Sequence, residues 1–597
     1  MLLLLFLLNN LNLKRVLFGL IICLSIIASL LTFKMVHVVP ATATTQEFSA
    51  ERAFNHVEAI CQDPHPMGSD EIQQVRTYIV DEITSMGITA IIQETTVPDY
   101  YSTIYNAEPV SIYNVFAVLQ GTNSTGSIVL VGHYDTVPVS PGANDNGSAV
   151  ATLLETTRSL IAGPPLKNDV ILLFTDAEEP GQYRYGARFF AENYELINDI
   201  RLVLNFEAVG RTGPSIMFET GPNNESLIQA LYQNAANPVA FSFISDFYRF
   251  VAKGSTDFVA FEEVGINGLN FAYSFERTIY HTALDNVDSV DKRSLQHHGD
   301  YALNLARYFG DLNFDEANSR VERDVVYHSL LYGTSIRYPA SWVIPIVILT
   351  GILLFLCIYI GLRRRMITKL GVSLSILAFL IEIFVLTLVL TLVWWGMEEL
   401  HYSLGTVAEP ALESPLFLLV FLFFSMTIMI ANRIWFAERT NSLSIHVGEM
   451  ISWWLLAMLA GFYLPGLNII LLWPVFFRLL PLSWIMLRKM ENNNSWGYFI
   501  LISVSSAVSI VLLTVPIYLF FQALGISSPG FSGSPTFPFI GLSIFFWMML
   551  ISLLLPNLEF FGNLKRRGVL YGLLAITIAC LIAAIVVPGI PVDSFGL

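Results

Sequence analysis

The sequence has few charged residues, and basic residues are the scarcest of them. Charged residues make up 13% of the 597 positions, and the mean hydropathy is +0.58, well outside the range of soluble globular proteins. Lys and Arg number 32 against 48 Asp and Glu, which gives a net charge of −16. This acidic balance argues against nucleic acid as a partner.

Cysteine is also scarce. The chain has four cysteines, of which Cys23, Cys357 and Cys580 lie in apolar segments. Only Cys61 lies in a stretch of ordinary soluble composition, so no disulfide can form within that stretch. A cysteine-based zinc site is not expected there, and an oxidising compartment is neither required nor excluded.

The apolar residues are unevenly distributed. Residues 16–36 are apolar, 45–320 have the composition of a soluble domain, and 341–590 are almost continuously apolar. A membrane-spanning helix needs about 20 apolar residues. The sequence therefore predicts a membrane protein that carries one water-soluble domain.

The first apolar segment, "VLFGLIICLSIIASLLTF", follows Lys14 and Arg15. A cleaved signal peptide is the alternative, but the apolar core of such peptides usually has about 7–15 residues. This segment is longer, and the small pair Ala41 and Ala43 lies well past its end. An uncleaved transmembrane anchor is therefore favoured.

The last part of the chain predicts eight further spans, at 341–362, 370–396, 414–432, 447–464, 466–487, 497–523, 537–556 and 568–589. Loops that contain Arg or Lys alternate with loops that contain none, and basic loops usually face the cytosol. The basic positions are Arg363, Arg364, Arg365, Lys369, Arg433, Arg439, Arg488, Lys489, Lys565, Arg566 and Arg567. Nine spans with a cytosolic N-terminus satisfy this rule and leave the soluble domain outside the cytosol.

The expected order along the chain follows from these spans. It comprises a cytosolic N-terminus (1–15), a transmembrane anchor (16–36), an extracytoplasmic soluble domain (45–315), a linker (316–340), an all-α domain of eight transmembrane helices (341–590) and an extracytoplasmic tail (591–597). Glu382 and Arg478 fall within the predicted spans, where ionisable groups are costly and often functional. They could neutralise each other, mark shifted span limits, or line a path for a transported substrate.

Short β-rich runs alternate with helical patterns between residues 110 and 310. Near-continuous apolar strands separated by helices indicate an α/β domain, a mostly parallel sheet with helices on both faces. In such sheets ligands bind beyond the carboxyl ends of the strands. We expect strands at 113–121, 127–135, 169–179, 201–210, 215–221 and 268–273, and helices at 148–162, 187–197, 225–236, 255–265 and 291–309.

Polar side chains follow several of these strands directly. His133 and Asp135 are two positions apart, so their side chains point to one face of a strand. That spacing lets the carboxylate accept from one imidazole nitrogen while the other nitrogen faces a metal. Asp145 precedes a helix in "GANDNGSA", a pattern that by itself is typical of an Asx turn or an N-cap.

Three glutamates and a second histidine have comparable positions. Glu178 and Glu179 are adjacent, so one could bind a metal while the other takes a proton from water; an acidic surface turn is the plainer interpretation. Glu207 ends an apolar strand, where an unpaired carboxylate is costly. His281, in "IYHTALDNVDSVD", is by itself typical of a surface histidine.

Together these residues predict a metal centre. Two histidines and three carboxylates, with no sulfur among them, suit a pair of zinc ions bridged by one carboxylate. Paired metals can bind an attacking hydroxide and polarise a carbonyl at the same time.

The order "HYD … GANDNGSA … EE … NFEA … YHTALD" resembles the di-zinc aminopeptidase family that includes bacterial leucyl aminopeptidases and glutamate carboxypeptidase. "PHPMGSDE" at 64–71 resembles a segment near the start of that family's domain, and the resemblance covers about residues 50–312. The nine-span layout is similar to a membrane-bound subgroup, the endoplasmic reticulum metallopeptidase and the vacuolar membrane protease.

The resemblance implies a role for each residue. Asp145 would bridge two zinc ions; Glu179 and His281 would complete one site, and His133 and Glu207 the other. It further implies Glu178 as the general base, Asp135 as the residue that orients His133, and a cis peptide after Asp145. Tyr273, with Tyr248 as the second choice, would stabilise the oxyanion. Many soluble members have aspartate where this chain has Glu207.

The resemblance thus implies a membrane-anchored zinc exopeptidase, an aminopeptidase acting on peptide substrates. A single-zinc glutaminyl cyclase on the same scaffold, or a non-catalytic binding module such as the transferrin receptor, are the alternatives. The short loops favour a bacterial plasma membrane; in a eukaryote, the endoplasmic reticulum or the vacuole is expected. The oligomeric state stays open.

Overall fold

The protein is described here by a computed structural model that covers residues 10–97, 110–179, 183–252, 256–317, 323–403, 406–407, 415–488, 495–524, 537–559, 567–586 and 590–591. Two compact units are present. One spans residues 33–339, and the other combines the residues up to 32 with 340–527 and 533–591. The predicted tail at 591–597 and the loops at 489–494 and 560–566 lie almost entirely outside the described residues.

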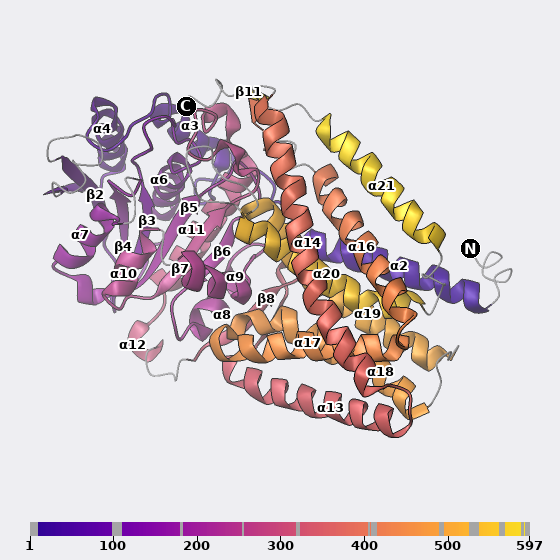
Figure 1. The fold of residues 1–597 in the computed structure, drawn as a ribbon. Helices are drawn as coiled ribbons and strands as arrows, with labels where there is room; N and C mark the ends of the chain where they lie inside the picture. The colour runs from indigo at the N-terminus through magenta and orange to yellow at the C-terminus, as the bar shows by residue number, and fades with distance from the viewer. Residues whose placement is uncertain are drawn as a thin grey trace. The chain divides into compact units, whose positions relative to one another are not determined.

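The first unit contains a seven-stranded mixed sheet in the order β1-β2-β4-β3-β5-β7-β6 (Figure 1). The four neighbouring strands β4, β3, β5 and β7 are parallel, as the sequence predicted, whereas β1, β2 and β6 pair antiparallel with their neighbours. The strands are β1 Ala90–Thr96, β2 Ser111–Leu119, β3 Ser127–His133, β4 Asp169–Thr175, β5 Ile200–Ala208, β6 Ile216–Thr220 and β7 Gly268–Tyr273.

Helices cover both faces of this sheet (Figure 1). Side chains alternate along a strand, so Ile128 and Leu130 pack in one core cluster while Val129 and Val131 pack in another. The first cluster lies under α3 Ala50–Ile60, α6 Gly147–Ile161 and α11 Lys292–Gly310, and the second under α7 Tyr185–Asn193 and α10 Phe258–Glu263. The remaining helices of this unit are α4 Asp70–Ser85, α8 Glu225–Asn234, α9 Ser242–Phe247 and α12 Phe314–Ala317.

The segment 316–340, expected to be a linker, differs from that expectation. Its described part forms an antiparallel hairpin, β8 Val325–Ser329 with β9 Ser335–Pro339. All of β8 is buried, and its backbone joins Phe241 through an isolated bridge at His328. The short apolar run "VVYHS" and the turn at Gly333, which has a φ of +69°, account for the hairpin.

The second unit is helical. Eight of its helices are long and apolar enough to cross a membrane, and a shorter apolar helix covers Ser543–Leu558. The helices are α2 Asn10–Leu30, α13 Val343–Arg363, α14 Lys369–Ser403, α16 Pro415–Ala437, α17 Ser442–Tyr463, α18 Asn468–Arg488, α19 Trp496–Leu524, α20 Phe537–Glu559 and α21 Arg567–Ile585, with a short pairing of β10 Thr406–Val407 and β11 Ile590–Pro591.

Glu382 and Arg478, the two ionisable residues singled out within the spans, have different partners. Arg478 in α18 donates to Oδ1 of Asn557 in α20 at 2.6 Å. Glu382 in α14 lines a small pocket with Arg433 and Glu449. The two therefore belong to separate polar groups within the helical unit.

Candidate metal centre

His133 is the last residue of β3, at the carboxyl end of the parallel strands. Its Nδ1 lies 3.0 Å from the backbone oxygen of Asp135 and 3.4 Å from its Oδ1. The same carboxylate accepts from the backbone N–H groups of Glu178 and Glu179, at 3.1 and 3.0 Å. Asp135 thereby fixes the imidazole of His133 and the turn after β4 relative to each other.

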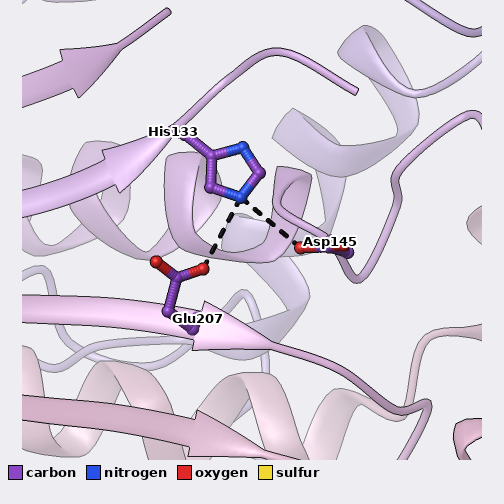
Figure 2. A group of neighbouring side chains, drawn as sticks. All are labelled: His133, Asp145 and Glu207. Atoms are coloured by element: carbon purple, nitrogen blue, oxygen red, sulfur yellow. Dashed lines mark ion pairs between the residues drawn. The ribbon is translucent and has the colours of Figure 1, made fainter. Parts of the chain in front are cut away.

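The other nitrogen of His133 faces two carboxylates (Figure 2). Its Nε2 lies 3.4 Å from Oδ1 of Asp145 and 3.5 Å from Oε2 of Glu207. Glu207 comes from β5, the neighbour of β3, and Asp145 from the segment before α6. The three side chains point toward one another from separate elements (Figure 2).

Asp145 also faces the second histidine. Its Oδ2 lies 3.3 Å from Nε2 of His281, and that nitrogen lies 3.0 Å from the carboxylate of Glu179. Each oxygen of Asp145 thus faces a different imidazole, and each imidazole faces one further carboxylate. His133, Asp145 and Glu207 form one group whose ligand atoms lie within 4.8 Å of one another, and Asp145, Glu179 and His281 form another.

Local backbone geometry brings these side chains together. Ala177, just before the two glutamates, and His281 both have positive φ, at 62° and 59°, a conformation uncommon for residues other than glycine. The peptide bond between Asp145 and Asn146 is cis, as the family resemblance implied. All five proposed ligands lie close together beyond the carboxyl ends of the central strands, although they come from five segments of the chain.

Asp285 supports the segment that carries Asp145, and the sequence did not single it out. Its Oδ1 accepts from the backbone and side-chain N–H groups of Asn144, both at 2.8 Å, and its Oδ2 accepts from the backbone N–H of Asp145 at 3.1 Å. Asp285 lies four residues after His281 in "HTALD". The carboxylate of Asp285 thereby joins the segment that carries Asp145 to the segment that carries His281.

Two asparagines hold Glu207. Asn205 donates to its Oε1 and Asn146 donates to its Oε2, both at 3.0 Å. Asn205 also donates to Oδ1 of Asn270 at 3.0 Å, which joins Glu207 to the neighbouring strand β7. These donors are placed to orient the longer glutamate side chain at the position where many soluble relatives were expected to have aspartate.

Arg184 is a further residue of the site that sequence reasoning missed. It lies at the start of α7, is 7% exposed, and its Nε lies 3.2 Å from Oε1 of Glu178. The sequence suggested that adjacent glutamates need a cation nearby, but the many arginines in the chain gave no reason to choose this one.

Burial and the neighbouring charged groups shift the pKa values of the imidazoles and glutamates in this cluster. Burial lowers the pKa of His281, but Glu179 and Asp145 outweigh it and raise this pKa to about 10. Burial likewise opposes protonation of His133, yet hydrogen bonds to Asp135, Asp145 and Glu207 raise its pKa well above the usual value. Burial raises the pKa of Glu179 to about 7 and that of Glu178 well above its usual value.

The donor set fits zinc. Oδ2 of Asp145 is buried and makes no hydrogen bond with any described residue, although His281 lies near it. Such an oxygen is placed to bind a cation, and imidazole nitrogens with carboxylate oxygens are ligands that zinc prefers. Protonated imidazoles supply the positive charge that metal ions would replace on binding.

The two candidate tyrosines occupy different environments. Tyr273 is fully buried, and its hydroxyl donates to Oδ1 of Asn144 at 2.9 Å. It therefore supports the Asp145 segment, and this geometry does not favour it as the oxyanion donor. Tyr248 is half-buried, packs against Phe218, and lies close enough to Arg184 to affect the pKa of that residue.

Comparison with known proteins finds a family match and several relatives for part of the chain. Residues 114–306 match Peptidase family M28. The chain is 28% identical over 284 residues to the vacuolar membrane protease of Schizosaccharomyces pombe, covering 46% of this chain and 33% of that protein. It is 31% identical over 235 residues to endoplasmic reticulum metallopeptidase 1 of Rattus norvegicus, covering 38% and 26%. The match thus spans a third or less of these relatives' length.

Solved structures that match part of this chain include a zinc aminopeptidase from Bacillus subtilis, with a TM-score of 0.36 and 16% identity over 45% of this chain and 96% of that chain. A glutaminyl cyclase from Porphyromonas gingivalis has a TM-score of 0.37 and 21% identity over 44% of this chain and 99% of that chain.

Proposed function

We propose, from the premise that this chain carries a Peptidase family M28 domain, that it is a membrane-anchored zinc exopeptidase of the aminopeptidase type. The observation that carries the proposal is the position of Asp145, whose two oxygens face His133 and His281 separately. A carboxylate between two imidazoles, each with its own second carboxylate, is the arrangement that a bridged metal pair requires. The names of the matched relatives, a protease and a metallopeptidase, agree with it.

In this proposal the five ligands divide into two sets that share Asp145. Glu179 and His281 would hold one zinc ion, and His133 and Glu207 the other. Bound zinc would supply Lewis acidity that polarises the peptide carbonyl and lowers the pKa of water toward about 7.

Glu178 is the proposed general base. It lies next to the ligand Glu179, and its carboxylate could take a proton from the attacking water and return it to the leaving amine. Arg184 holds that carboxylate from one side, while Asp135 fixes the backbone of Glu178. Tyr248 is the proposed donor to the developing oxyanion.

The membrane topology is part of the proposal. Nine spans, α2, α13, α14 and α16 to α21, with a cytosolic N-terminus would place every basic loop in the cytosol and the peptidase domain outside it. The matched relatives are named for the vacuolar membrane and the endoplasmic reticulum. A bacterial plasma membrane is the alternative location that the short loops favour.

The test uses the full chain purified in detergent and assayed with aminoacyl fluorogenic substrates. Release of the fluorophore should stop with a chelator and return with added zinc, and metal analysis should find two zinc ions per chain. Glu178→Gln should keep zinc and the fold but lower turnover by about 10²–10⁴-fold, because a general base contributes that much. Glu192→Gln, at an exposed glutamate of α7, is the matched control and should leave turnover unchanged.

Other results would point to the alternatives. One zinc per chain with conversion of N-terminal glutamine to pyroglutamate would identify a glutaminyl cyclase. Zinc binding without turnover of either substrate class would identify a binding module. Full activity of Glu178→Gln would remove this residue from the proposed role.

A further inference from the structure

A polar pocket lies within the helical unit, between α14, α16 and α17. Its polar lining comprises Ser375, Glu382, Asn432, Arg433 and Glu449, and the other lining side chains are apolar. Glu382 lies about 20 Å along α14 from the start of that helix, at 1.5 Å per residue. Ionisable groups this deep in apolar helices are costly and frequently functional.

Arg433 is already engaged by Glu449 and His446. Its Nη2 donates to both oxygens of Glu449, at 2.8 and 2.6 Å, and its Nη1 lies 2.7 Å from Nε2 of His446. A guanidinium can only donate hydrogen bonds, so Nε2 of His446 accepts and the imidazole is neutral. Arg433 and Glu449 therefore balance each other's charge.

Glu382 has a different environment. Its side chain is 7% exposed and hydrogen-bonds with Asn432, yet its Oε1 has no hydrogen-bond partner among the described residues. In its ionised form Glu382 gives the pocket lining two carboxylates against one guanidinium, and so one excess negative charge. Because an uncompensated buried charge costs several kcal/mol, the pocket favours one positive charge beside Glu382.

The size of the pocket limits what can supply that charge. The space open to the centre of a water molecule is ≈ 10 Å³, which is room for about one water-sized species. An organic amine, a peptide or a lipid headgroup is too large. The oxygens of Glu382, Asn432 and Ser375 are ligands suited to an alkali cation, whereas a divalent ion would leave excess positive charge beside Arg433.

We propose that this pocket, which we name the Glu382 pocket, binds one alkali cation, Na⁺ or K⁺, at Oε1 of Glu382. The site belongs to the helical unit and does not depend on the peptidase activity. Cation binding would link the stability of the contacts among α14, α16 and α17 to the ion content of the surrounding solution.

The test measures thermal unfolding of the full chain in detergent, at constant ionic strength, as choline chloride is replaced by NaCl or KCl. We expect the Tm to rise with one of these cations and to saturate, because an ion bound only to the folded state stabilises it. Glu382→Gln should abolish the rise. Glu399→Gln, at an exposed position of the same helix, is the matched control and should keep it.

Equilibrium binding of ²²Na⁺ or ⁸⁶Rb⁺ to the unaltered chain provides a second measurement that does not depend on the folding of a variant. One bound ion per chain supports the proposal. Three results would overturn it: no ion binding and no Tm shift, an equal shift in Glu382→Gln, or a Tm that responds to pH alone. The last would mean that Glu382 carries a proton and that the pocket holds only water.

Discussion

The carboxylate of Asp285 accepts three hydrogen bonds from Asn144 and Asp145. Asp285→Asn keeps the shape of the side chain but replaces one accepting oxygen with an amide that donates, so one of those N–H groups loses its acceptor. Because groups that orient metal ligands typically contribute 10–100-fold to metal affinity, we expect zinc affinity to fall by about that factor. Competition with a chromophoric chelator measures it.

Asp288→Asn is the matched control, because Asp288 lies in the same loop and is exposed. Its zinc affinity should equal that of the unaltered chain. An unchanged affinity in Asp285→Asn would show that the Asp145 segment keeps its position without this carboxylate.

Arg184 forms an ion pair with Glu178, with its Nε 3.2 Å from Oε1 of the glutamate. Arg184→Gln should let the glutamate side chain move, which lowers kcat by about 10-fold, since proton transfer depends on position. The KM and the zinc content should change little, and Arg184→Lys should recover part of the kcat. Steady-state kinetics with metal analysis separates these effects.

Arg188→Gln supplies the comparison for Arg184, because Arg188 lies four residues further along, in α7, and pairs with Glu263 in partly exposed positions. Its kcat should be unchanged. A rise in KM at constant kcat in Arg184→Gln would instead assign Arg184 to substrate binding.

At the scale of elements, strand composition explains what the sequence could predict. The parallel strands β3, β4 and β5 are buried on both faces, so they form continuous apolar runs that end in polar side chains, and both the strands and the positions of those side chains were predictable. Strand β1 was missed because "AIIQETT" lies at the sheet edge and is largely exposed. The hairpin β8–β9 was missed because β9, "SIRYP", is only partly buried and ends in proline.

The supporting residues of the site could not be predicted in the same way. Asp285 is 141 residues from Asn144, and Asn146 is 61 residues from Glu207. No periodicity connects such pairs, and an aspartate in a polar turn or an asparagine before a helix has many local uses. Only the folded sheet shows which of these side chains meet.

The close packing of β3 against α6 depends on Gly132. A Cβ atom at this position would lie 2.7 Å from Cβ of Ala149. Gly132→Ala should therefore force α6 away from the strand that ends in His133, at about 1–3 kcal/mol of stability. We also expect weaker zinc retention, because α6 follows Asp145 directly.

The compensating variant tests that explanation. Ala149→Gly removes the atom that Gly132→Ala would contact, so the double variant should regain zinc retention and part of the stability, less about 1 kcal/mol for glycine within a helix. Chemical denaturation and zinc analysis of the unaltered chain, the two single variants and the double variant complete a double-mutant cycle. Additive losses in the double variant would contradict a direct contact.

For the whole molecule, three buried histidines contribute to the response to acid. Burial lowers the pKa of His297 to about 4 and those of His298 and His328 to about 3. The folded state therefore favours neutral imidazoles, and the unfolded chain binds protons first, near pH 6.5. Each histidine contributes stability that is complete above about pH 6.5 and is lost as the pH falls toward 4, at about 1.4 kcal/mol per pH unit.

His328 allows this prediction to be checked on one group. Both of its ring nitrogens lack hydrogen-bond partners among the described residues, and the ring packs against Phe241 and Phe243. His328→Leu should reduce the loss of stability between pH 6.5 and 4 by the amount that one histidine contributes. His37→Gln, at an exposed histidine, should leave that loss unchanged. Thermal unfolding across this pH range measures both.

The unit that contains the sheet spans residues 33–339, and the chain continues from both of its ends into long apolar helices, α2 before it and α13 after it. A single proteolytic nick on either side would leave the domain tethered through the other. Release of this unit from the apolar helices would therefore require two separate cleavages, unlike that of a domain attached at one end only.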